Sequence, residues 1–537
     1  MWRVSACAAP RSRPPVRNTR SASARLAPHV TDLDGPVFAL VNLPETVKGA
    51  LFARYSRYPG TLRRLFLDEF ADSLPELPAS FEGSEGSRAA ELYERMFLEY
   101  GDDSVAQLGG AHVACEWVSN VLTKVLQRPR LAAYLEQSTR YIAYDAPMPG
   151  GGYRYYRDAD LGPRYEQAMD ELFDIYSSSL PKVTAWVDET YPRADGESDA
   201  ARRRAVNAKA YDLLRGLLPA ASLSHMGIYA TGQAYEQLIL HLLGHPLPEA
   251  RHYGGLILDA IKAVMPSFVA RVERPELGGE WVRYLEQRRE AGERWAARLN
   301  LDRDDSAEDR PSVKLLHVDG DEDQLLAALL FEAAGVSEER TREEVARLSA
   351  EERAALIADL VGDRANRRHR PGRGFEALRY RFEIVSDYGA FRDLQRHRML
   401  TVQWQGLTPD LGAGIPDEVV EAGAGDLYAR ALERSEEEYE RLAAAGLRDA
   451  APYALCLGFR IRYVLDLNAR EAMHTIELRS GREGHPSYRA VAHEMHAQIA
   501  EHHPAVAATM THVDTSTEPR LERILSEMRT ERRALAG

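Results

Sequence analysis

The sequence is poor in cysteine. Its three cysteines, Cys7, Cys115 and Cys456, lie far apart and form no CxxC pair, which excludes a disulfide framework and a zinc-ribbon module and fits a reducing compartment. No apolar run approaches the roughly 18 residues that a membrane span needs. The chain also lacks a GxGxxG or Walker-type phosphate loop, a GxSxG serine and an HExxH metal helix. We therefore expect a soluble, cytoplasmic protein with no bound metal and no membrane partner.

Lysine is also scarce. Nearly all of the 68 basic residues are arginines, and the more numerous acidic residues give a formal net charge of −14. This balance argues against nucleic-acid binding, which usually needs a basic face. A GC-rich coding sequence would explain the many arginines without any function, so only the position of an arginine is informative.

What the chain does have is length, since 537 residues are enough for two to four domains. Strand-like alternation is rare: residues 380–384 are the best example, and residues 139–144 are a second candidate. The fold class that we predict is therefore a helix-rich α+β protein. Amphipathic patterns predict helices near residues 89–99, 104–127, 163–190, 200–217, 246–270, 323–335, 341–361, 416–445 and 486–502.

Two segments of biased composition stand apart from the rest. Residues 1–28 are rich in arginine and serine and hold no acidic residue, so we predict a disordered tail, although a transit peptide or a start codon placed too early would give the same composition. Residues 299–312 are polar and acidic, which predicts a linker. This linker would separate a first domain, residues 36–298, from a second domain, residues 313–537.

Two motifs of the first part recur in the second part in the same order, which indicates a divergent tandem duplication. The matched pairs are Arg128-Pro-Arg130, seven residues, Ser138 with Arg396-His-Arg398, seven residues, Gly406, and Arg215-Gly-Leu-Leu-Pro219 with Arg448-Asp-Ala-Ala-Pro452.

The Arg396-His397-Arg398 motif has a specific chemical meaning. Its side chains fan out and cannot all grip one carboxylate, but they suit a polyanion such as a pyrophosphate, because guanidinium forks match phosphate oxygens. A strand pattern runs into the motif and apolar or neutral residues follow it, so we expect it to be half buried. Taken alone, it could equally be a solvated basic turn.

Two further stretches could bind a ligand. Glu136, Ser138 and Arg140 are spaced two apart, so in an extended segment they would place a carboxylate, a hydroxyl and a guanidinium on one side, although a polar strand end would look the same. In the helical pattern of residues 467–479, Arg470 and His474 share one side. Such an i, i+4 pair is by itself typical of a surface.

Together these motifs resemble the flavin-dependent thymidylate synthase family. Its signature is Arg-His-Arg, seven residues and Ser-x-Arg-Tyr, followed by Arg…Leu-Pro…Asn-x-Arg…Leu-Arg. The resemblance covers most of residues 90–245 and 365–505, one copy in each part. It implies two tandem copies of a helix-rich domain, each with a small, mainly antiparallel sheet. Because standard members form tetramers with shared sites, it also implies a homodimer of this chain.

The departures from the signature are complementary. The first copy keeps the Glu-x-Ser-x-Arg-Tyr stretch but has proline for the histidine, and Thr231, Gln233 and Leu242 where the family has asparagine and two arginines. The second copy keeps Arg-His-Arg and the later Asn-x-Arg…Leu-Arg stretch, but its serine loop has lost the acidic residue, the serine and the arginine. The resemblance thus implies one composite active site, and a site made from the opposite residues would be inactive.

The resemblance also implies a role for each matching residue. Arg479 is the expected catalytic residue, because a fixed guanidinium beside N3 of the uracil would stabilise the ionised pyrimidine and activate C5 without a cysteine nucleophile. The expected FAD-binding residues are Arg396, His397, Arg398, Glu376, Asn468, Arg470 and His474. The expected substrate-binding residues are Glu136, Ser138, Thr139, Arg140, Arg215, Arg448 and Arg479.

The function implied is reductive methylation of dUMP to dTMP with FAD, methylene-tetrahydrofolate and NADPH. One alternative is a flavin- or nucleotide-binding pseudoenzyme of the same family that does not catalyse the reaction. A second is a helical scaffold without a small-molecule site, and a third is flavin-dependent methylation of another pyrimidine nucleotide.

Overall fold

The computed structural model describes residues 20–73, 106–148, 151–193, 195–301, 310–516 and 521–536. The chain forms two compact units, and each draws segments from both halves of the sequence. Unit 1 consists of Met1–Ser178, Leu217–Ala307 and Glu433–Cys456. Unit 2 consists of Ser179–Gly216, Glu308–Leu432 and Leu457–Gly537.

Each unit is built on a four-stranded antiparallel sheet, and the two sheets have the same topology. The strand order is β1-β2-β4-β3 in unit 1 and β5-β6-β8-β7 in unit 2. This repetition confirms the prediction of an α+β tandem duplication. The strands are β1 (Val37–Leu40), β2 (Gly110–Ser119), β3 (Ala132–Glu136), β4 (Leu223–Thr231), β5 (Ser312–Asp319), β6 (Arg379–Asp387), β7 (Thr401–Trp404) and β8 (Arg460–Asn468).

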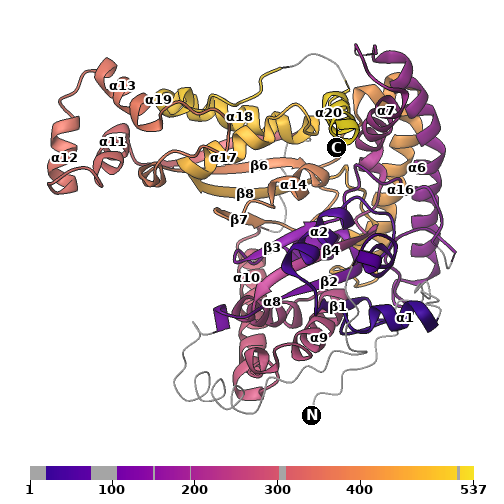
Figure 1. The fold of residues 1–537 in the computed structure, drawn as a ribbon. Helices are drawn as coiled ribbons and strands as arrows, with labels where there is room; N and C mark the ends of the chain where they lie inside the picture. Colours follow the sequence, from indigo (N-terminus) through magenta and orange to yellow (C-terminus); the bar gives the residue numbers. More distant parts are fainter. Residues whose placement is uncertain are drawn as a thin grey trace. The chain divides into compact units, whose positions relative to one another are not determined.

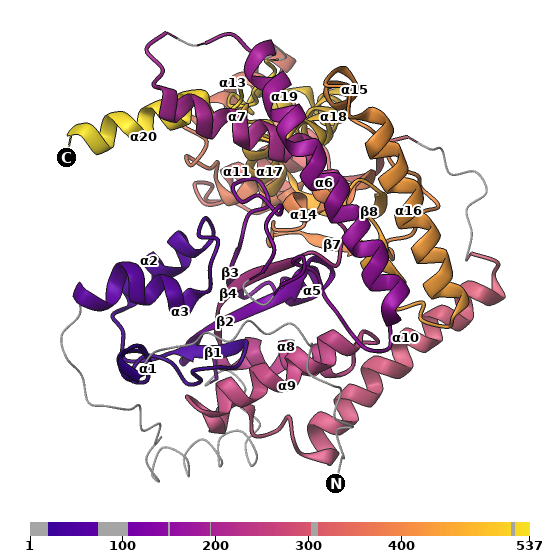
Figure 2. The ribbon, with the colours of Figure 1, turned by 90° about the vertical axis from the view of Figure 1, so that its right-hand side faces the viewer.

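The helices of unit 1 cover its sheet. Helices α8 and α9 pack together and lie against β1, β2 and β4 on one face (Figure 2). The helices of unit 1 are α1 (Arg20–Leu26), α2 (Glu45–Tyr55), α3 (Leu62–Leu65), α5 (Asn120–Leu126), α8 (Gly232–Leu243), α9 (Pro248–Lys262) and α10 (Glu280–Arg298), while α6 (Gly162–Thr190) and α16 (Gly425–Ala444) run through both units.

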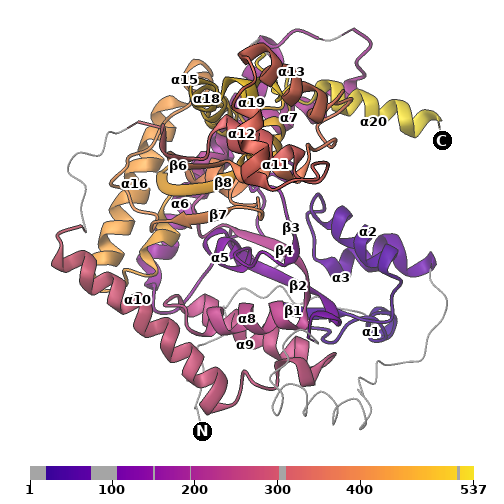
Figure 3. The same cartoon turned by 90° about the vertical axis from the view of Figure 1, so that its left-hand side faces the viewer.

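In unit 2, α17 and α18 lie over the sheet of β5, β6 and β8 (Figure 1). Helices α11, α12 and α13 are inserted between β5 and β6 and pack on one another (Figure 3). No helix among the described residues is long and apolar enough to cross a membrane. The helices are α7 (Asp199–Leu214), α11 (Glu322–Leu330), α12 (Glu338–Val345), α13 (Ala350–Val361), α14 (Tyr388–Leu394), α15 (Asp417–Glu421), α17 (Ala469–Arg479), α18 (Pro486–His502), α19 (Pro504–Ala508) and α20 (Ile524–Ala536).

The clearest sequence patterns form the expected elements. Tyr380, Phe382 and Ile384 alternate on β6 and are fully buried, as the strand pattern predicted. Thr231 and Asn468 occupy the same position in the two copies, and each side chain caps the helix that follows, α8 or α17. The predicted helix at residues 486–502 is α18. Local signals are sufficient in these places because one face is apolar and the ends are capped.

The helix predicted at residues 104–127 is wrong where the structure describes it. Residues 110–119 form β2, and only Asn120–Leu126 are helical, as α5. Most of β2 is buried on both faces, so its apolar residues do not alternate, and such a strand looks like a buried helix in the sequence. A β-bulge between Cys115 and Val118, with Trp117 at φ 60°, disturbs the period further.

Two other predictions need correction, and one cannot be examined. Residues 139–144 form a turn instead of a strand, because the strand of this region, β3, has already ended at Glu136. The tail predicted to be disordered at 1–28 includes the helix α1, whose Leu26 is buried with Phe38 and Phe66. The helix predicted at residues 89–99 lies outside the described residues.

The compact units do not follow the order of the sequence on the two sides of residues 299–312, because each unit also takes a segment from the other half of the chain. Ser179–Gly216, from the first half, belongs to unit 2, where α7 packs on α20. Glu433–Cys456, from the second half, belongs to unit 1, where Ala220 N donates to Leu455 O (2.7 Å). The two copies have therefore exchanged one segment each. A single boundary in the sequence cannot describe such an arrangement, because each compact unit contains residues from both sides of it.

We predict that Leu26→Ala lowers the free energy of unfolding by about 2–4 kcal/mol. The substitution removes most of a fully buried side chain from the hydrophobic cluster that Leu26 forms with Phe38 and Phe66. The neighbouring Arg25, which pairs with Asp72 at the surface, is the matched control, and Arg25→Ala should change stability by less than about 1 kcal/mol. Urea unfolding followed by circular dichroism measures both. If the Leu26→Ala variant is as stable as the wild type, α1 does not pack on the core, and residues 1–28 are a disordered tail as the sequence predicted.

Candidate functional site

Arg396, His397 and Arg398 directly follow α14 in unit 2. The start of α14 is fixed by Asp387, whose Oδ1 accepts a hydrogen bond from Ala390 N (2.8 Å). Arg396 and Arg398 are exposed, whereas His397 between them is only 7% exposed. The motif is half buried, as its sequence context predicted.

Both ring nitrogens of His397 have protein partners. Arg479 Nε donates to His397 Nε2 (2.9 Å), and His397 Nδ1 lies 3.1 Å from Thr475 Oγ1 and 3.4 Å from Glu471 Oε1. Burial lowers the pKa of His397 well below its usual range, and the charge of Arg479 lowers it further. The neutral ring therefore carries its proton on Nδ1 and accepts at Nε2. Neither nitrogen is left for a ligand.

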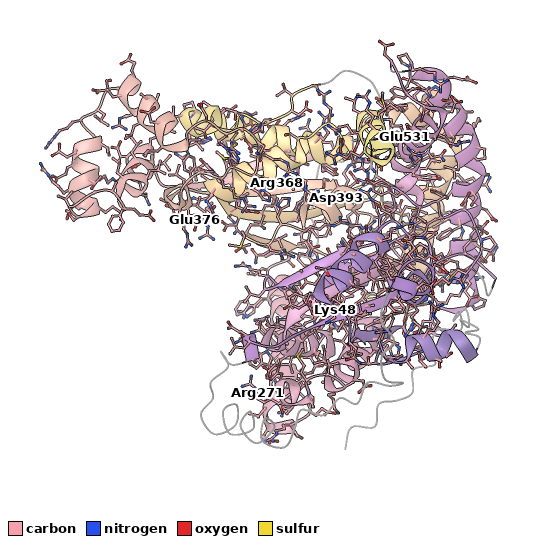
Figure 4. All side chains as sticks on the ribbon, viewed as in Figure 1. Lys48, Arg271, Arg368, Glu376, Asp393 and Glu531 are labelled. Carbon is pink, nitrogen blue, oxygen red and sulfur yellow. The ribbon has the colours of Figure 1, made fainter. Side chains whose placement is uncertain are left out.

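Arg479, the last residue of α17, shares one carboxylate with two other arginines. Asp393 Oδ1 lies 3.8 Å from Arg479 Nη1 and 3.6 Å from Arg396 Nη1, and its Oδ2 lies 3.5 Å from Arg215 Nη1. Asp393 is labelled in Figure 4. Burial lowers the pKa of Arg479, and Asp393 raises it. Even with Asp387 at 3.6 Å from Arg215 Nη2, the three guanidinium groups keep an excess of positive charge, which suits an anion.

Arg215 comes from the first half of the sequence but lies in unit 2. It lines a cavity of about 360 Å³, and its side chain is nearly fully buried. Within the described part of the chain, Arg215 Nη2 has no hydrogen-bond partner. The wall also holds basic and acidic side chains: Lys209, Arg460, His485, Asp212, Asp387 and Glu418. A buried donor without an acceptor is costly, so a ligand oxygen in this cavity would be stabilised.

The close approach of Arg215 to α14 depends on a glycine. A Cβ atom on Gly389, in the first turn of α14, would lie 3.0 Å from Arg215 Nε and 2.9 Å from Asp387 Oδ1. Any larger residue would displace the guanidinium group from Asp393. The first turn of α14 is thus shaped to admit an arginine from the exchanged segment.

The remaining side chains predicted to bind a flavin lie at the start of α17. Asn468 Oδ1 caps the helix by accepting from Glu471 N (2.9 Å). Arg470 Nη1 is 3.5 Å from Glu376 Oε1, and Arg470 Nε donates to Pro371 O (2.9 Å). The structure therefore brings Glu376 and Arg470 together although they are far apart in the sequence.

His397, Glu471 and His474 are the one group among the described residues with the composition of a metal site. Their ligand atoms lie within 4.8 Å of one another. Burial lowers the pKa of His474 to about 4, and Arg370 is among the charges that lower it. Arg370 also acts on His397 and Glu471. These guanidinium charges oppose a divalent cation, so the geometry favours an anionic ligand here too.

A family model described as "Thymidylate synthase complementing protein" matches this chain twice, at residues 67–267 and 315–505. The chain belongs to this family. It is the family that the sequence motifs indicated, present as two copies, and the function of the chain is therefore thymidylate synthase-like.

Relatives align with nearly the whole chain and over nearly their whole own length. A UPF0159 protein of Chlamydia muridarum (strain MoPn / Nigg) is 37% identical over 519 residues, covering 94% of this chain and 97% of the relative. A UPF0159 protein of Thermoplasma acidophilum is 30% identical over 521 residues, covering 90% and 98%. Among solved structures, the UMP/dUMP methylase PolB from Streptomyces cacaoi bound with 5-Br dUMP is 22% identical, with a TM-score of 0.30, and covers 38% of this chain and 95% of its own.

The first copy of the family domain presents its predicted substrate residues differently from the expectation. Glu136 ends β3 and points into unit 1, where its Oε2 lies 2.9 Å from Lys124 Nζ and 2.8 Å from Gln127 Nε2. The side chains of Glu136 and Lys124 are almost completely buried. Glu136 therefore does not form one extended row with Ser138 and Arg140, and its carboxylate is held by the protein.

Ser138, Thr139 and Arg140 form a turn instead. Ser138 Oγ accepts from Arg140 N (3.2 Å), and Ser138 O accepts from Tyr141 N (3.4 Å). Thr139 is buried, whereas Ser138 and Arg140 are half buried. The Arg57 guanidinium stacks over the ring of Tyr141, 4.6 Å from its centre. Arg57 thus joins the turn, and no motif in the sequence pointed to it.

The register of the two copies corrects the match between Arg215 and Arg448. The register that places Thr231 on Asn468 also places Pro219 on Cys456, and these two residues form a β-bridge with each other. It places Arg215 on Pro452 instead of Arg448. Arg448 is an exposed residue in the segment of unit 1 that follows α16. The cationic position is therefore present only once in the duplicated chain.

The counterpart of the Asp393 cluster in unit 1 keeps one arginine, Arg128 in the place of Arg396, but has lost the carboxylate and the other two arginines. The alignment of Arg128-Pro-Arg130 with Arg396-His-Arg398 places Val125 on Asp393 and Pro129 on His397. The register of Thr231 on Asn468 places Leu242 on Arg479 and Arg215 on Pro452. Alignment of the first residues of α9 and α18, Pro248 and Pro486, places Glu249 on Ser487. Glu249 is buried, and its carboxylate accepts hydrogen bonds from Ser119 N (2.9 Å), Ser119 Oγ (2.6 Å) and Tyr453 Oη (2.6 Å). An internal carboxylate thus fills a place that borders a cavity in unit 2.

We predict that Glu249 makes stability depend on pH. Burial raises the pKa of this carboxyl from 4.5 to about 7, so the folded state binds the proton more tightly than the unfolded state. Stability should therefore fall as the pH rises from 5 to 8, by up to roughly 3 kcal/mol from this group. Glu249→Gln keeps an acceptor for Ser119 and cannot ionise, so its stability should fall less. Urea unfolding at pH 5, 6, 7 and 8 compares the two, and parallel curves would contradict the assignment.

Proposed function

We propose that the protein is an FAD-dependent thymidylate synthase that methylates dUMP with methylene-tetrahydrofolate and NADPH. The observation that carries this proposal is the cluster of Arg215, Arg396 and Arg479 around Asp393 in unit 2. It joins Arg215, the arginine of the Arg…Leu-Pro motif that is kept only in the first copy, to Arg396 and to Arg479, and Arg479 has no arginine counterpart in the first copy. This observation supports one complete set of arginines for one active site per chain, and it does not support a second set.

The cavity beside Arg215 suits the phosphate of a nucleotide. Arg215 Nη2 is buried and without a hydrogen-bond partner among the described residues, and a phosphate oxygen would provide the acceptor. The wall of the same cavity also holds Lys209, Arg460 and the acids Asp212, Asp387, Asp417 and Glu418. Lys209 is paired with Glu522 (2.7 Å) and Glu418 (3.5 Å), so the support for a phosphate comes from Arg215. Ser138, Thr139 and Arg140 remain predicted ligands of the nucleotide on the basis of the family motif.

Arg479 is proposed to act on the pyrimidine ring. Its Nε is already bound to His397, so the terminal nitrogens are the ones that face Asp393 and a ligand. A guanidinium held in a buried place acts more strongly on a developing negative charge than it would in water. Placed beside N3 and O4, it would stabilise the ionised uracil and so raise the nucleophilicity of C5. No cysteine is needed for this step.

His397 is proposed as a positioning residue for Arg479, in place of the flavin contact expected from the motif. Its two nitrogens are bound to Thr475 and Arg479. The neutral ring offers an acceptor to Nε without adding charge to a cluster that already holds three guanidinium groups. The role of His397 is thus to fix the direction of one hydrogen bond.

The groups around α17 fit a flavin dinucleotide. Exposed Arg396 and Arg398 and half-buried Arg470 could hold its diphosphate, and Asn468 and His474 line the same region with neutral polar groups. The bound flavin would supply the hydride that reduces the transferred carbon. This chain would contribute binding and orientation. By the family pattern, we propose a dimer of this duplicated chain in place of a tetramer.

A catalytically inactive flavin- or nucleotide-binding protein is the second candidate. The specific observation in its favour is the inward-facing Glu136, since one member of the Glu-x-Ser-x-Arg motif is already paired with Lys124. The cluster around Asp393 favours catalysis, because an inactive descendant would have no reason to keep Arg479 buried and oriented.

The two candidates are separated by an assay of the purified full chain. We predict a bound flavin with its visible absorbance and dUMP-dependent formation of dTMP in the presence of the folate donor and NADPH. Arg479→Ala should abolish dTMP formation, with flavin still bound, whereas Arg340→Ala, an exposed residue of α12, should behave as wild type. Flavin binding without dTMP formation by the wild type would establish the inactive protein, and failure to take up FAD would overturn the whole proposal.

The role of His397 gives a separate prediction. His397→Phe removes both polar ring atoms, which should lower kcat by about 10- to 100-fold, the cost of losing one charged hydrogen bond in a buried place. His397→Gln retains an acceptor for Arg479 and should recover part of kcat. The flavin dissociation constant should change little in either variant. If instead both variants lose flavin and retain turnover at saturating FAD, His397 is a flavin ligand, as the motif alone implied.

A further inference from the structure

The loop between α13 and the short helix η8 (Arg373–Ala377) is strongly basic. Residues 362–372 contain Arg364, Arg367, Arg368 and Arg370, with Asp363 as the single acidic residue. The sequence motifs did not involve this loop, and the proposed function assigns it no role. Because the chain is rich in arginine, the simplest explanation is a solvated basic turn. Whether the loop is instead a binding site depends on the contacts that its side chains make.

Arg364 anchors the first end of the loop. Its Nη1 and Nη2 each donate to a different oxygen of Glu477 at 2.6 Å, and both side chains are almost fully buried. Nη1 also donates to Thr509 O (3.0 Å), and Nε donates to His369 O (2.6 Å). A buried bidentate pair of this kind has a fixed geometry. Arg364 is therefore structural.

The other end and the middle of the loop are held as well. Arg470 Nε donates to Pro371 O (2.9 Å). Within the loop, Asn366 Oδ1 accepts from Arg368 N (2.9 Å), and His369 N donates to Asn366 O (3.0 Å). The backbone between the two anchors thus follows one defined turn, and it presents Arg367, Arg368 and Arg370 from a rigid base.

The side chains of Arg367, Arg368 and Arg370 form no ion pair within the described part of the chain. Arg368 and Arg370 are exposed and Arg367 is half buried; Figure 4 labels Arg368. Over the described ranges of the chain, no ion pair or side-chain hydrogen bond engages their guanidinium groups. The nearby carboxylate of Glu376 is already shared by Arg373 (3.4 Å) and Arg470 (3.5 Å). The loop therefore carries positive charge that the protein does not neutralise.

The loop faces the start of α17. Arg370 acts electrostatically on His397, Glu471 and His474, and Arg367 acts on His474. Unneutralised like charges repel one another, and three of them within four residues on a rigid turn cost stability unless an anion binds. Planar guanidinium forks match phosphate oxygens in particular.

We propose that Arg367, Arg368 and Arg370 form a phosphate-binding site, separate from Arg215, for the phosphate of a nucleotide cofactor. Binding of phosphate follows from this chain's own contacts. Which nucleotide provides it rests on the proposed function: either the diphosphate of a flavin dinucleotide or the additional phosphate that distinguishes NADPH from NADH.

The first test uses inorganic pyrophosphate and a triple variant, Arg367→Gln, Arg368→Gln and Arg370→Gln, measured by isothermal titration calorimetry. Because pyrophosphate also has access to Arg215 and Arg396, the number bound per chain is measured together with the affinity. The variant should bind one pyrophosphate fewer, or bind at this site at least 10-fold more weakly. The control removes the same charge from α12 and the residues after it, with Arg340→Gln, Arg342→Gln and Arg347→Gln. Equal binding by the triple variant and the wild type overturns the site.

The second test identifies the source of the phosphate. Dissociation constants for FAD and FMN, and KM values for NADPH and NADH, are compared between the wild type and the triple variant. A loss of preference for FAD assigns the site to the flavin, and a loss of preference for NADPH assigns it to the reductant. Unchanged preference in both pairs overturns the assignment to a cofactor. A wild type that binds pyrophosphate at this site but forms no dTMP refutes the proposed function and leaves the phosphate site standing.

Discussion

A buried guanidinium group that must share its carboxylate sets the conditions for the candidate site. Burying the Arg479 guanidinium group costs free energy unless hydrogen-bond acceptors surround it. Its carboxylate partner, Asp393, also pairs with Arg215 and Arg396, so Asp393 alone does not satisfy Arg479. His397 provides the missing acceptor, and it can do so only as a neutral ring. Burial lowers the pKa of His397 and the charge of Arg479 lowers it further, so the ring stays neutral and can accept the hydrogen bond from Arg479. What the cluster leaves unbalanced is positive charge, which favours an anion.

The exchange of segments explains how the two copies can each lack different motif residues while one compact unit still contains the residues of both. Arg215 belongs to the first copy by sequence but completes the cation cluster of unit 2, whereas the corresponding Pro452 lies in unit 1. A duplicated chain can therefore keep an arginine in one copy and the Arg-His-Arg motif in the other without losing either from the same compact unit. Gly389 shows that the recipient helix is adapted to the exchange, because a side chain there would push Arg215 away.

Sequence reasoning reached the duplication and the α+β class, because these depend on the order of the motifs and on the apolar period of helices and strands. It failed at β2, where burial on both faces removes the period of two, and at Glu136, whose pairing with Lys124 depends on long-range packing. Sequence reasoning also did not find the segments that each half contributes to the other unit, because such a segment leaves no local signal. Asp393 was missed for a related reason: a single aspartate on a helix means little until three arginines from distant segments meet it. The arginines themselves were found because the motifs gave them positions.

The same place in the fold has opposite electrostatics in the two units, and this difference explains why one copy cannot replace the other. In unit 2, Arg215 borders a cavity, and its Nη2 has no hydrogen-bond partner among the described residues, with Asp387 Oδ1 3.6 Å away. In unit 1, the corresponding place holds Glu249, a carboxylate that already has three donors. An anionic ligand would meet a buried acid there, and burial is severe enough to bring the pKa of that acid to about 7. Removing the charge of Glu249 alone would not restore binding, because the arginine that should face the ligand is Pro452. In unit 1, the carboxyl group of Glu249 therefore occupies the place where an anionic ligand would lie in unit 2. Its hydrogen-bond donors come from Ser119 and Tyr453, so the packing of unit 1 needs no ligand there.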